Sequence, residues 1–525
     1  MGLIIEGGVY FLLLFTPFAF GGVELWALGV FQIVAGLVVA AWAWSVHDQA
    51  PGSRGLSSYR GARTAFWISA ALFILLVLFQ LSPLPPAWVQ RLAPGTYDLY
   101  ARALPGYAEG KEFEAASLPA WLLVRKGDQI PTARAPGAPA IPEPPKNGAE
   151  GIPARHSAWR GLSINTFETW QRLSLLLSLL GLFAVVSSWY RTKERIARLV
   201  AVTAFSGFAV SMFGIIQKLT WNGKLYWVRE GTYGNVFGPF VNQNTYAAFA
   251  GTIFPLAVCM GLSSLRGIGK GRPGALPQLL VWGFAAVTMC CGIFYSLSRG
   301  GILSAALSLA IVAAMLLYYG KAGRELAVLG LMALAAVGFL AWIGSEKVIE
   351  RVGTLKEGQS VPSLEVRMGA WQKTQELFAS SPLVGTGLGS FRFAFMRFAP
   401  PGEGWWVQAD NEYIELACEV GIVGGVIFLA GLVSWLAIVA RPWLFRGREE
   451  RYHYVGVSAG IAGLLLHSAV TANLQIPANG LMLAVAAAML VCLTGMVSKS
   501  RQRRRPGIGS ESPATTTQRD EEASS

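Results

Sequence analysis

Long apolar runs decide what this chain can fold into. About twelve of them reach the length at which an α-helix crosses a hydrocarbon layer about 30 Å thick. A backbone in lipid must satisfy its own hydrogen bonds, which favours helices there. The sequence therefore predicts an all-α polytopic membrane protein of about 12 transmembrane helices with two long extracytoplasmic loops. The predicted spans are 4–21, 24–45, 65–84, 171–190, 197–217, 241–263, 277–297, 300–319, 324–344, 411–440, 454–473 and 476–497.

The composition and the charge pattern agree with this class. Only 14% of the residues are charged, whereas soluble domains carry roughly a quarter. Most of the net charge of +13 comes from short basic clusters between alternate spans, such as 191–198 and 501–505. This pattern follows the positive-inside rule, so both termini are predicted to be cytoplasmic. Clusters that flank spans form no basic groove, so no nucleic-acid partner is expected.

Polar segments between the spans set the predicted domain boundaries. The stretch 131–153 is rich in Pro, Ala and Gly and cannot bury enough apolar surface to fold alone. The predicted regions are N-terminal transmembrane helices at 1–84, a partly disordered extracytoplasmic loop at 85–170, a transmembrane core at 171–344, a large extracytoplasmic loop at 345–410, C-terminal transmembrane helices at 411–497, and a disordered basic and polar cytoplasmic tail at 498–525.

Two arginines on the predicted outer side are candidates for anion binding. Arg299 lies in the tight turn Ser-Leu-Ser-Arg-Gly-Gly at 296–301. It either snorkels at the membrane edge or binds phosphate oxygens through its guanidinium. Arg367 begins a predicted helix with Trp371 on the same face. This pair is either a cation–π contact that stabilises the loop or a sugar platform beside a phosphate clamp.

The glycine-rich turn Gly-Thr-Gly-Leu-Gly at 385–389 is only superficially like a nucleotide loop. No strand–helix unit follows it, so dinucleotide binding is not expected. A tight turn that leads into Phe391 is the better interpretation, and Arg392 then adds positive charge next to it.

Polar residues at the starts of two spans form the remaining candidates. Asp410, Asn411 and Glu412 open the span at 411–440 and act either as helix caps or as a general base with hydrogen-bonding partners. Asn242 and Asn244 open the span at 241–263 and either cap it or bind sugar hydroxyls. Two further carboxylates at membrane depth and one histidine complete the group: Glu415, Glu419 and His467, the last interpreted as a satisfied structural histidine.

These fragments together resemble the O-antigen ligase/polymerase superfamily of bacterial envelope glycosyltransferases. The fragments are Gly-Pro-Phe-Val-Asn-Gln-Asn at 238–244, Ser-Arg-Gly at 298–300, Arg367 with Trp371, the Ser381–Gly389 turn, the segment from Asn411 to Gly421, and the late pieces at 467–470 and 476–479. One departure matters, because Asp410 stands where the family commonly has the histidine regarded as catalytic in ligases. In the late segment, Thr471 stands where relatives often have an acid.

The resemblance implies a metal-independent transferase, without a cofactor, that takes glycan from an undecaprenyl-diphosphate carrier. It would be a multi-pass protein of the bacterial inner membrane with its site facing the periplasm, in the loop at 345–410 and nearby turns. The expected partners are the lipid-linked donor and acceptor, membrane lipid and a chain-length regulator protein. The implied catalytic residues are Asp410, Arg299 and Arg367, and the implied substrate-binding residues are Asn242, Asn244, Trp371, Arg392, Asn411 and Glu412.

Three functions remain open at this stage. The leading hypothesis is a polymerase of lipid-linked repeat units into O-antigen or exopolysaccharide, favoured by the missing histidine. The second is an O-antigen ligase or protein O-oligosaccharyltransferase. A polysaccharide or lipid transporter is the rival from another class, but transporters hold their site near the midplane and often show repeats. The sequence has no visible internal repeat, and its polar candidates lie on the predicted outer side.

Overall fold

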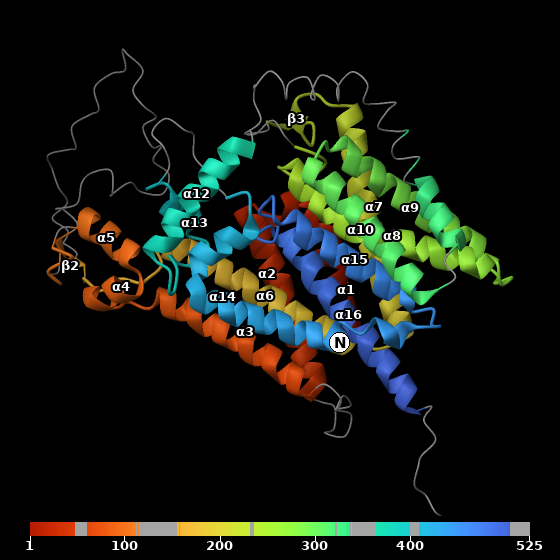
Figure 1. Cartoon of the computed structure of the whole chain (residues 1–525), viewed down its shortest axis with the longest axis horizontal. Coiled ribbons are helices and arrows are strands. Elements are labelled where there is room, and N and C mark those ends of the chain that lie inside the picture. The colour runs from red at the N-terminus through yellow and green to blue at the C-terminus, as the bar shows by residue number, and fades with distance from the viewer. Residues whose placement is uncertain are drawn as a thin grey trace, which may run out of the picture.

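The computed structural model confirms an all-α polytopic membrane protein, with helices packed into one bundle (Figure 1). It describes residues 1–47, 60–104, 106–111, 113–114, 155–156, 158–230, 236–320, 323–332, 334, 338, 364–398 and 409–503. Within these residues nine helices are long and apolar enough to span a membrane. The long helices are α1 (Gly2–Phe18), α2 (Leu25–His47), α3 (Arg60–Leu81), α6 (Thr166–Trp189), α7 (Lys193–Leu219), α8 (Gln243–Ile268), α9 (Ala275–Tyr295), α10 (Arg299–Tyr319), α14 (Glu412–Val439), α15 (Arg451–His467) and α16 (Pro477–Arg503).

The difference between nine spans and the predicted twelve has a simple origin. Helices α1 and α15 lie in predicted spans but have only 17 residues each. The predicted span 324–344 is described only at 324–332, 334 and 338, and its other residues lie outside the described residues. Helix α15 ends at His467 rather than at residue 473 as predicted, so that histidine lies at a helix end and not within a span.

Helix α8 is the centre of the bundle, since 89% of its most apolar 18-residue stretch is buried inside the protein. Helix α15 packs closely against it because glycines face α8. A Cβ atom at Gly460 would lie 2.0 Å from the carbonyl oxygen of Thr252, and one at Gly456 would lie 2.7 Å from the Cα atom of Leu256. Small residues at such a spacing let helix backbones approach closely in a membrane.

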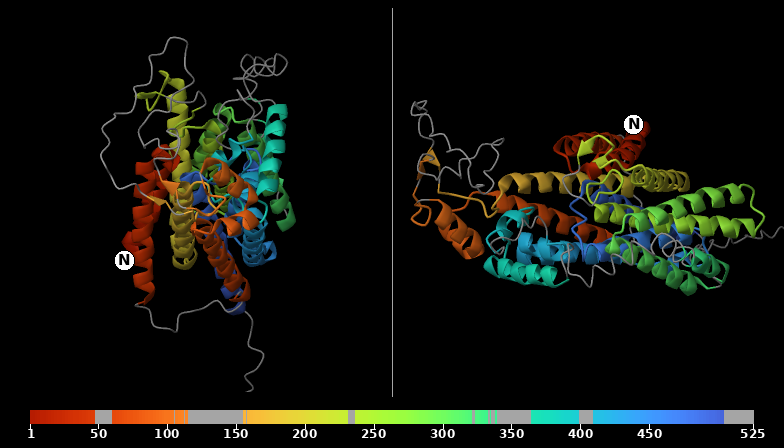
Figure 2. Two further views of the ribbon diagram at one scale, coloured as in Figure 1. Left: turned by 90° about the vertical axis from the view of Figure 1, so that its left-hand side faces the viewer. Right: turned by 90° about the horizontal axis from the view of Figure 1, so that it is seen from above.

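The two long loops build a common layer beyond one end of the bundle (Figures 1 and 2). The first loop provides α4 (Pro86–Leu92) and α5 (Pro94–Ala103), and the second provides α12 (Leu364–Ser380) and α13 (Phe391–Phe395). The helix predicted to begin at Arg367 is thus present as α12. A guanidinium nitrogen of Arg397 donates to the carbonyl oxygen of Gly95 (3.2 Å) and thereby joins the loops.

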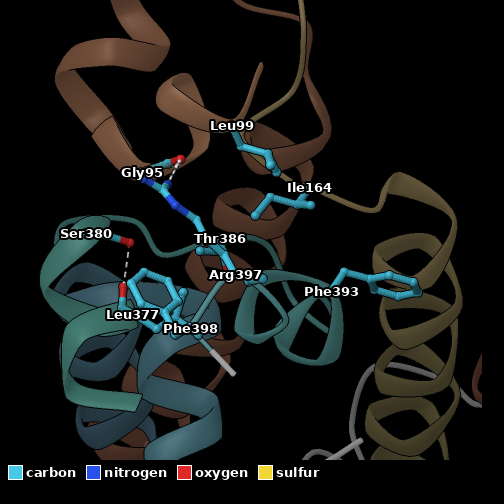
Figure 3. A pocket seen from close by; sticks show the side chains of 10 residues that line it. Gly95, Leu99, Ile164, Leu377, Ser380, Thr386, Phe393, Arg397 and Phe398 are labelled. Carbon is cyan, nitrogen blue, oxygen red and sulfur yellow. Dashed lines mark hydrogen bonds between the residues drawn. The ribbon is translucent and has the colours of Figure 1, made fainter. Parts of the chain in front are cut away.

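A small cavity of about 20 Å³ lies at this junction between α5 and the α12–α13 region (Figure 3). Phe398 and Leu377 line it with Ile164, and Arg397 crosses above them towards Gly95. The cavity holds about one water molecule, so the junction is a packed contact between loops and has no room for a sugar. The predicted flexible stretch 131–153 lies outside the described residues.

The remaining elements are short. They are η1 (Phe20–Gly22), η6 (Pro442–Phe445), and two antiparallel strand pairs, β1 (Phe113–Glu114) with β2 (Arg155–His156) and β3 (Lys224–Leu225) with β4 (Arg229–Glu230).

Candidate functional site

The α15–α16 loop (468–476) gathers most of the predicted site residues at one end of the bundle. The backbone N–H of Glu412 donates to the carbonyl oxygen of Ser468 (2.9 Å), which fixes the start of α14 on this loop. The start of α10 lies on its other side, where a Cβ atom at Gly300 would be 2.9 Å from the His467 ring and 3.1 Å from Val470. The loop therefore bridges two motifs that are more than one hundred residues apart in the sequence.

The starts of α8 and α10 are joined by one side-chain hydrogen bond. The Ser298 hydroxyl donates to Oδ1 of Asn244 (2.7 Å) and accepts from the backbone N–H of Gly301 (3.1 Å), so it caps α10. Asn242 caps α8 by accepting from the backbone N–H of Asn244 (2.7 Å). This geometry holds Arg299, the first residue of α10, beside the two asparagines. Arg299 is exposed and forms no hydrogen bond or ion pair with any residue that the structure describes.

The start of α14 is tied to α12 in a similar way. Nε1 of Trp371 donates to the carbonyl oxygen of Ala409 (3.0 Å). Asn411 caps α14 by accepting from the backbone N–H groups of Tyr413 (3.0 Å) and of the following residue. Between them Asp410 is half-buried and has a left-handed backbone with φ +50°. Its carboxylate is therefore presented at a fixed turn and is not part of the helix.

Two predicted site residues are placed differently. Arg392 of α13 pairs with Glu168 of α6, and its guanidinium lies over the Phe393 ring at 4.7 Å, so its charge is already neutralised. Arg367 belongs to α12, but its side chain lies outside the described residues.

The acidic residues of α14 anchor the loops around the site. The Glu412 carboxylate accepts from the backbone N–H groups of Leu474 (3.0 Å) and Asn473. Glu415 accepts from the backbone N–H of Ala409 (3.2 Å) and from the side-chain amide of Gln475 (2.6 Å).

Glu419 accepts from the backbone N–H of Phe391 (3.1 Å). The guanidinium of Arg172 on α6 exerts an electrostatic attraction on all three carboxylates and donates to the carbonyl oxygen of Gln475 (2.9 Å). The acids are thus buried because each holds part of a loop.

The glycine-rich turn at 385–389 docks into a break in α14. Its role in the structure is therefore to pack against that helix. Gly421 has φ 64° and ψ −169° and interrupts the helix. Before the break, carbonyl oxygens of α14 accept hydrogen bonds from the turn, as from the backbone N–H of Gly387 to Glu419 (3.0 Å). After the break, the backbone N–H of Ile422 donates to the carbonyl oxygen of Pro382 (2.8 Å). A Cβ atom at Gly385 would lie 2.3 Å from the Glu419 carbonyl oxygen, and its φ is +70°. Only glycine fits there, because both the space and the backbone conformation exclude a side chain.

Gln80 at the C-terminal end of α3 completes this docking. Its Nε2 donates to the carbonyl oxygens of Val384 (2.7 Å) and Glu419 (2.9 Å), and its Oε1 accepts from the backbone N–H of Leu388 (3.2 Å). The side chain is fully buried and its amide hydrogen-bonding capacity is largely used.

Sequence reasoning missed Gln80, Arg172 and Asn473. A signal existed for Arg172, because a basic residue on the predicted outer side departs from the positive-inside rule. The interpretation of His467 as a satisfied histidine was wrong, since neither ring nitrogen has a partner among the described residues. Within the same residues no group of three His, Cys, Asp or Glu side chains is placed to hold a metal ion.

Comparison with protein families gives a match over part of the chain. Residues 284–429 match the family described as O-antigen ligase. Over this domain the chain is similar to the O-antigen ligase family. This domain contains Arg299, Arg367, Trp371, Arg392, Asp410, Asn411 and Glu412, and it confirms the resemblance to the O-antigen ligase/polymerase superfamily. Asn242, Asn244 and His467 lie outside the match. No curated protein matches the chain.

Proposed function

We propose that this protein is a membrane glycosyltransferase that polymerises undecaprenyl-diphosphate-linked repeat units into O-antigen or exopolysaccharide at the outer face of the bacterial inner membrane. The family domain supports the reaction class. The observation that carries the proposal is Arg299, an exposed arginine without a partner among the described residues, at a helix N-terminus beside Asn244. Such a site binds a diphosphate through charge and through free backbone N–H groups.

The diphosphate is the leaving group in this reaction. When the acceptor hydroxyl attacks the anomeric carbon, the bond from that carbon to the phosphate oxygen breaks and its electron pair stays on the diphosphate. Arg299 stabilises that charge as it develops. Arg367 is proposed to assist, whereas Arg392 contributes less because Glu168 already neutralises it.

The proton of the acceptor hydroxyl needs a base, and Asp410 is the better candidate. Glu412 is 8% exposed and its carboxylate accepts two backbone hydrogen bonds from the α15–α16 loop. Asp410 is half-buried at a fixed turn before α14. Its carboxylate takes the proton while the new bond forms. Trp371 and the two asparagines at α8 are proposed to position sugars.

A ligase is the second candidate, and the description of the matching family favours it. A ligase would move finished glycan onto lipid A-core or a protein instead of extending it. The two reactions share the donor and differ in the acceptor. The departure at Asp410, where the resemblance places a histidine, favours polymerisation.

Glycan analysis of a deletion strain tests the proposal. The strain is complemented with wild type, Arg299→Ala or Arg299→Lys. We expect single repeat units on the carrier at the outer face in the deletion and Arg299→Ala strains, and polymer with wild type. Full-length polymer stranded on its carrier would identify a ligase, and units retained on the inner face would identify a transporter. Unchanged glycan in the deletion strain would contradict all three.

A further inference from the structure

His467 is a buried polar residue that the described structure leaves without a partner. Its side chain is 1% exposed, and both ring nitrogens lack hydrogen bonds among the described residues. Buried polar groups in proteins almost always bond to protein, ordered water or ligand. The exception at His467 therefore points to a partner that the chain itself does not supply.

The imidazole ring lies against the start of α10. A Cβ atom at Gly300 would come within 2.9 Å of both Cδ2 and Nε2 of His467, so the ring edge that carries Nε2 faces the second residue of that helix. The first N–H groups of a helix have no intrahelical partner, and the helix dipole favours an anion there. Arg299 adds an exposed cation at the same place.

A second unpartnered side chain lies in the α15–α16 loop. Asn473 is fully buried, and neither its amide nitrogen nor its amide oxygen has a partner in the described part of the chain. Its backbone N–H instead bonds to Glu412, the first residue of α14. Unpartnered polar groups thus border the loop on the side of Arg299 and on the side of Asp410, where donor and acceptor are proposed to meet.

We propose that His467 is a further substrate-contacting residue, which binds the diphosphate of a polyprenyl-linked donor together with Arg299 and the N-terminal N–H groups of α10. The ring donates Nε2–H to a phosphate oxygen. An imidazole suits this place because it can donate this hydrogen bond whether neutral or charged. The identity of the ligand rests on the proposed function.

Binding of undecaprenyl diphosphate without sugars tests the proposal independently of transfer. The full-length protein in lipid nanodiscs is titrated with this carrier, and undecaprenol serves as the reference for the lipid tail. His467→Ala should weaken binding of the diphosphate about ten-fold or more, and His467→Gln, which keeps an N–H donor, should weaken it less. Neither variant should change binding of undecaprenol.

The same helix offers a matched control. His453 lies in the first turn of α15, at the opposite end from His467, and its Nδ1 also lacks a partner among the described residues. His453→Gln should leave carrier binding unchanged. An equal loss in both histidine variants would show a general effect on α15 and would overturn the proposal.

Two further results separate this inference from the proposed function. If His467→Ala binds undecaprenyl diphosphate as tightly as wild type does, the role of His467 is overturned and the proposed function still stands. Failure of wild type to bind the diphosphate in preference to undecaprenol would contradict both. If His467→Ala does not fold, Gly300→Ala replaces it, because the new methyl group must displace the ring; a folded Gly300→Ala with unchanged binding would equally overturn the proposal.

Discussion

The polar side chains at the two ends of the helical bundle differ in whether they have hydrogen-bond or ion-pair partners. At the end where α15 begins, several charged groups pair with one another. Glu325 accepts from the Tyr452 hydroxyl (3.0 Å) and lies 3.7 Å from Arg266, while Arg272 pairs with Glu449 at 2.6 Å. At the end where α15 stops, Arg299 has no described partner, the buried side chains of His467 and Asn473 lack hydrogen bonds among the described residues, and the carboxylates accept hydrogen bonds from backbone N–H groups.

This difference separates structural charges from functional ones. Arg451 and His453 at the paired end each keep one unpartnered nitrogen, but Glu325, Glu449 and Glu450 there each have a cationic partner. A paired network fixes loops and leaves little to offer a ligand. The end with unpaired donors is suited to bind an anionic substrate, and it is the end that carries most of the family motifs.

Removal of Arg299 should have the largest effect. Arg299→Ala should lower the rate of glycan transfer by about 100-fold or more, because a single donor that stabilises a leaving anion is worth that much. Arg272→Ala, which removes a paired cation at the opposite end, should change the rate less than about 2-fold. The measurement is consumption of lipid-linked single units by purified protein. Equal losses of transfer rate in the two variants would contradict the distinction between the two ends of the bundle.

Asp410→Asn should have the second-largest effect on activity. Loss of a general base typically lowers kcat by about 100-fold or more while the KM for the donor changes little. Glu449→Gln at the paired end is the control and should keep its kcat. A fully active Asp410→Asn would mean that the base lies elsewhere and that Asp410 only terminates the loop before α14.

The glycine-rich turn should affect stability as well as activity. Gly385→Ala places a methyl group 2.3 Å from a carbonyl oxygen at a φ of +70°. The backbone conformation alone should cost about 1–3 kcal/mol of folding free energy. Gly283→Ala on α9, which meets nothing within 4 Å, is the matched control and should unfold at or above the wild-type temperature. Thermal unfolding in detergent measures both; a Gly385→Ala variant as stable as wild type would contradict the docking.

The smallest effect should be a pH dependence at the paired end. The hydrogen bond from Arg272 holds the pKa of Glu449 below its ordinary value of 4.5. A carboxyl with a lowered pKa in the folded state contributes stability above its unfolded pKa, and this is lost as the pH falls through the folded pKa. The unfolding temperatures of wild type and Glu449→Gln should therefore differ slightly at pH 7 and converge below about pH 4. A difference that grows on acidification would contradict this account.

Hydropathy was enough to find most of the helices, because length and apolarity are what a membrane requires. It could not find the break at Gly421, since that glycine lies inside an apolar run and the break is made by the docked turn. The caps Asn242 and Asn411 were predictable from residue type at helix starts.

The site itself was only partly predictable. The sequence indicated Arg299 and Asp410 as candidates, but not that Asn244 is bound by Ser298 or that Glu168 neutralises Arg392. Those contacts join segments far apart in the chain, and no local pattern encodes them. The position of His467 depended on where α15 ends, which the apolar run obscured.

One measurement tests the central claim most directly. Purified protein is reconstituted in liposomes with isolated lipid-linked repeat units, and the products on the carrier are separated by length. The account predicts longer carrier-linked glycans with wild type, equal products with Arg272→Ala, and single units with Arg299→Ala. Polymer formed by Arg299→Ala at the wild-type rate would contradict the assignment of the site to the unpaired end of the bundle.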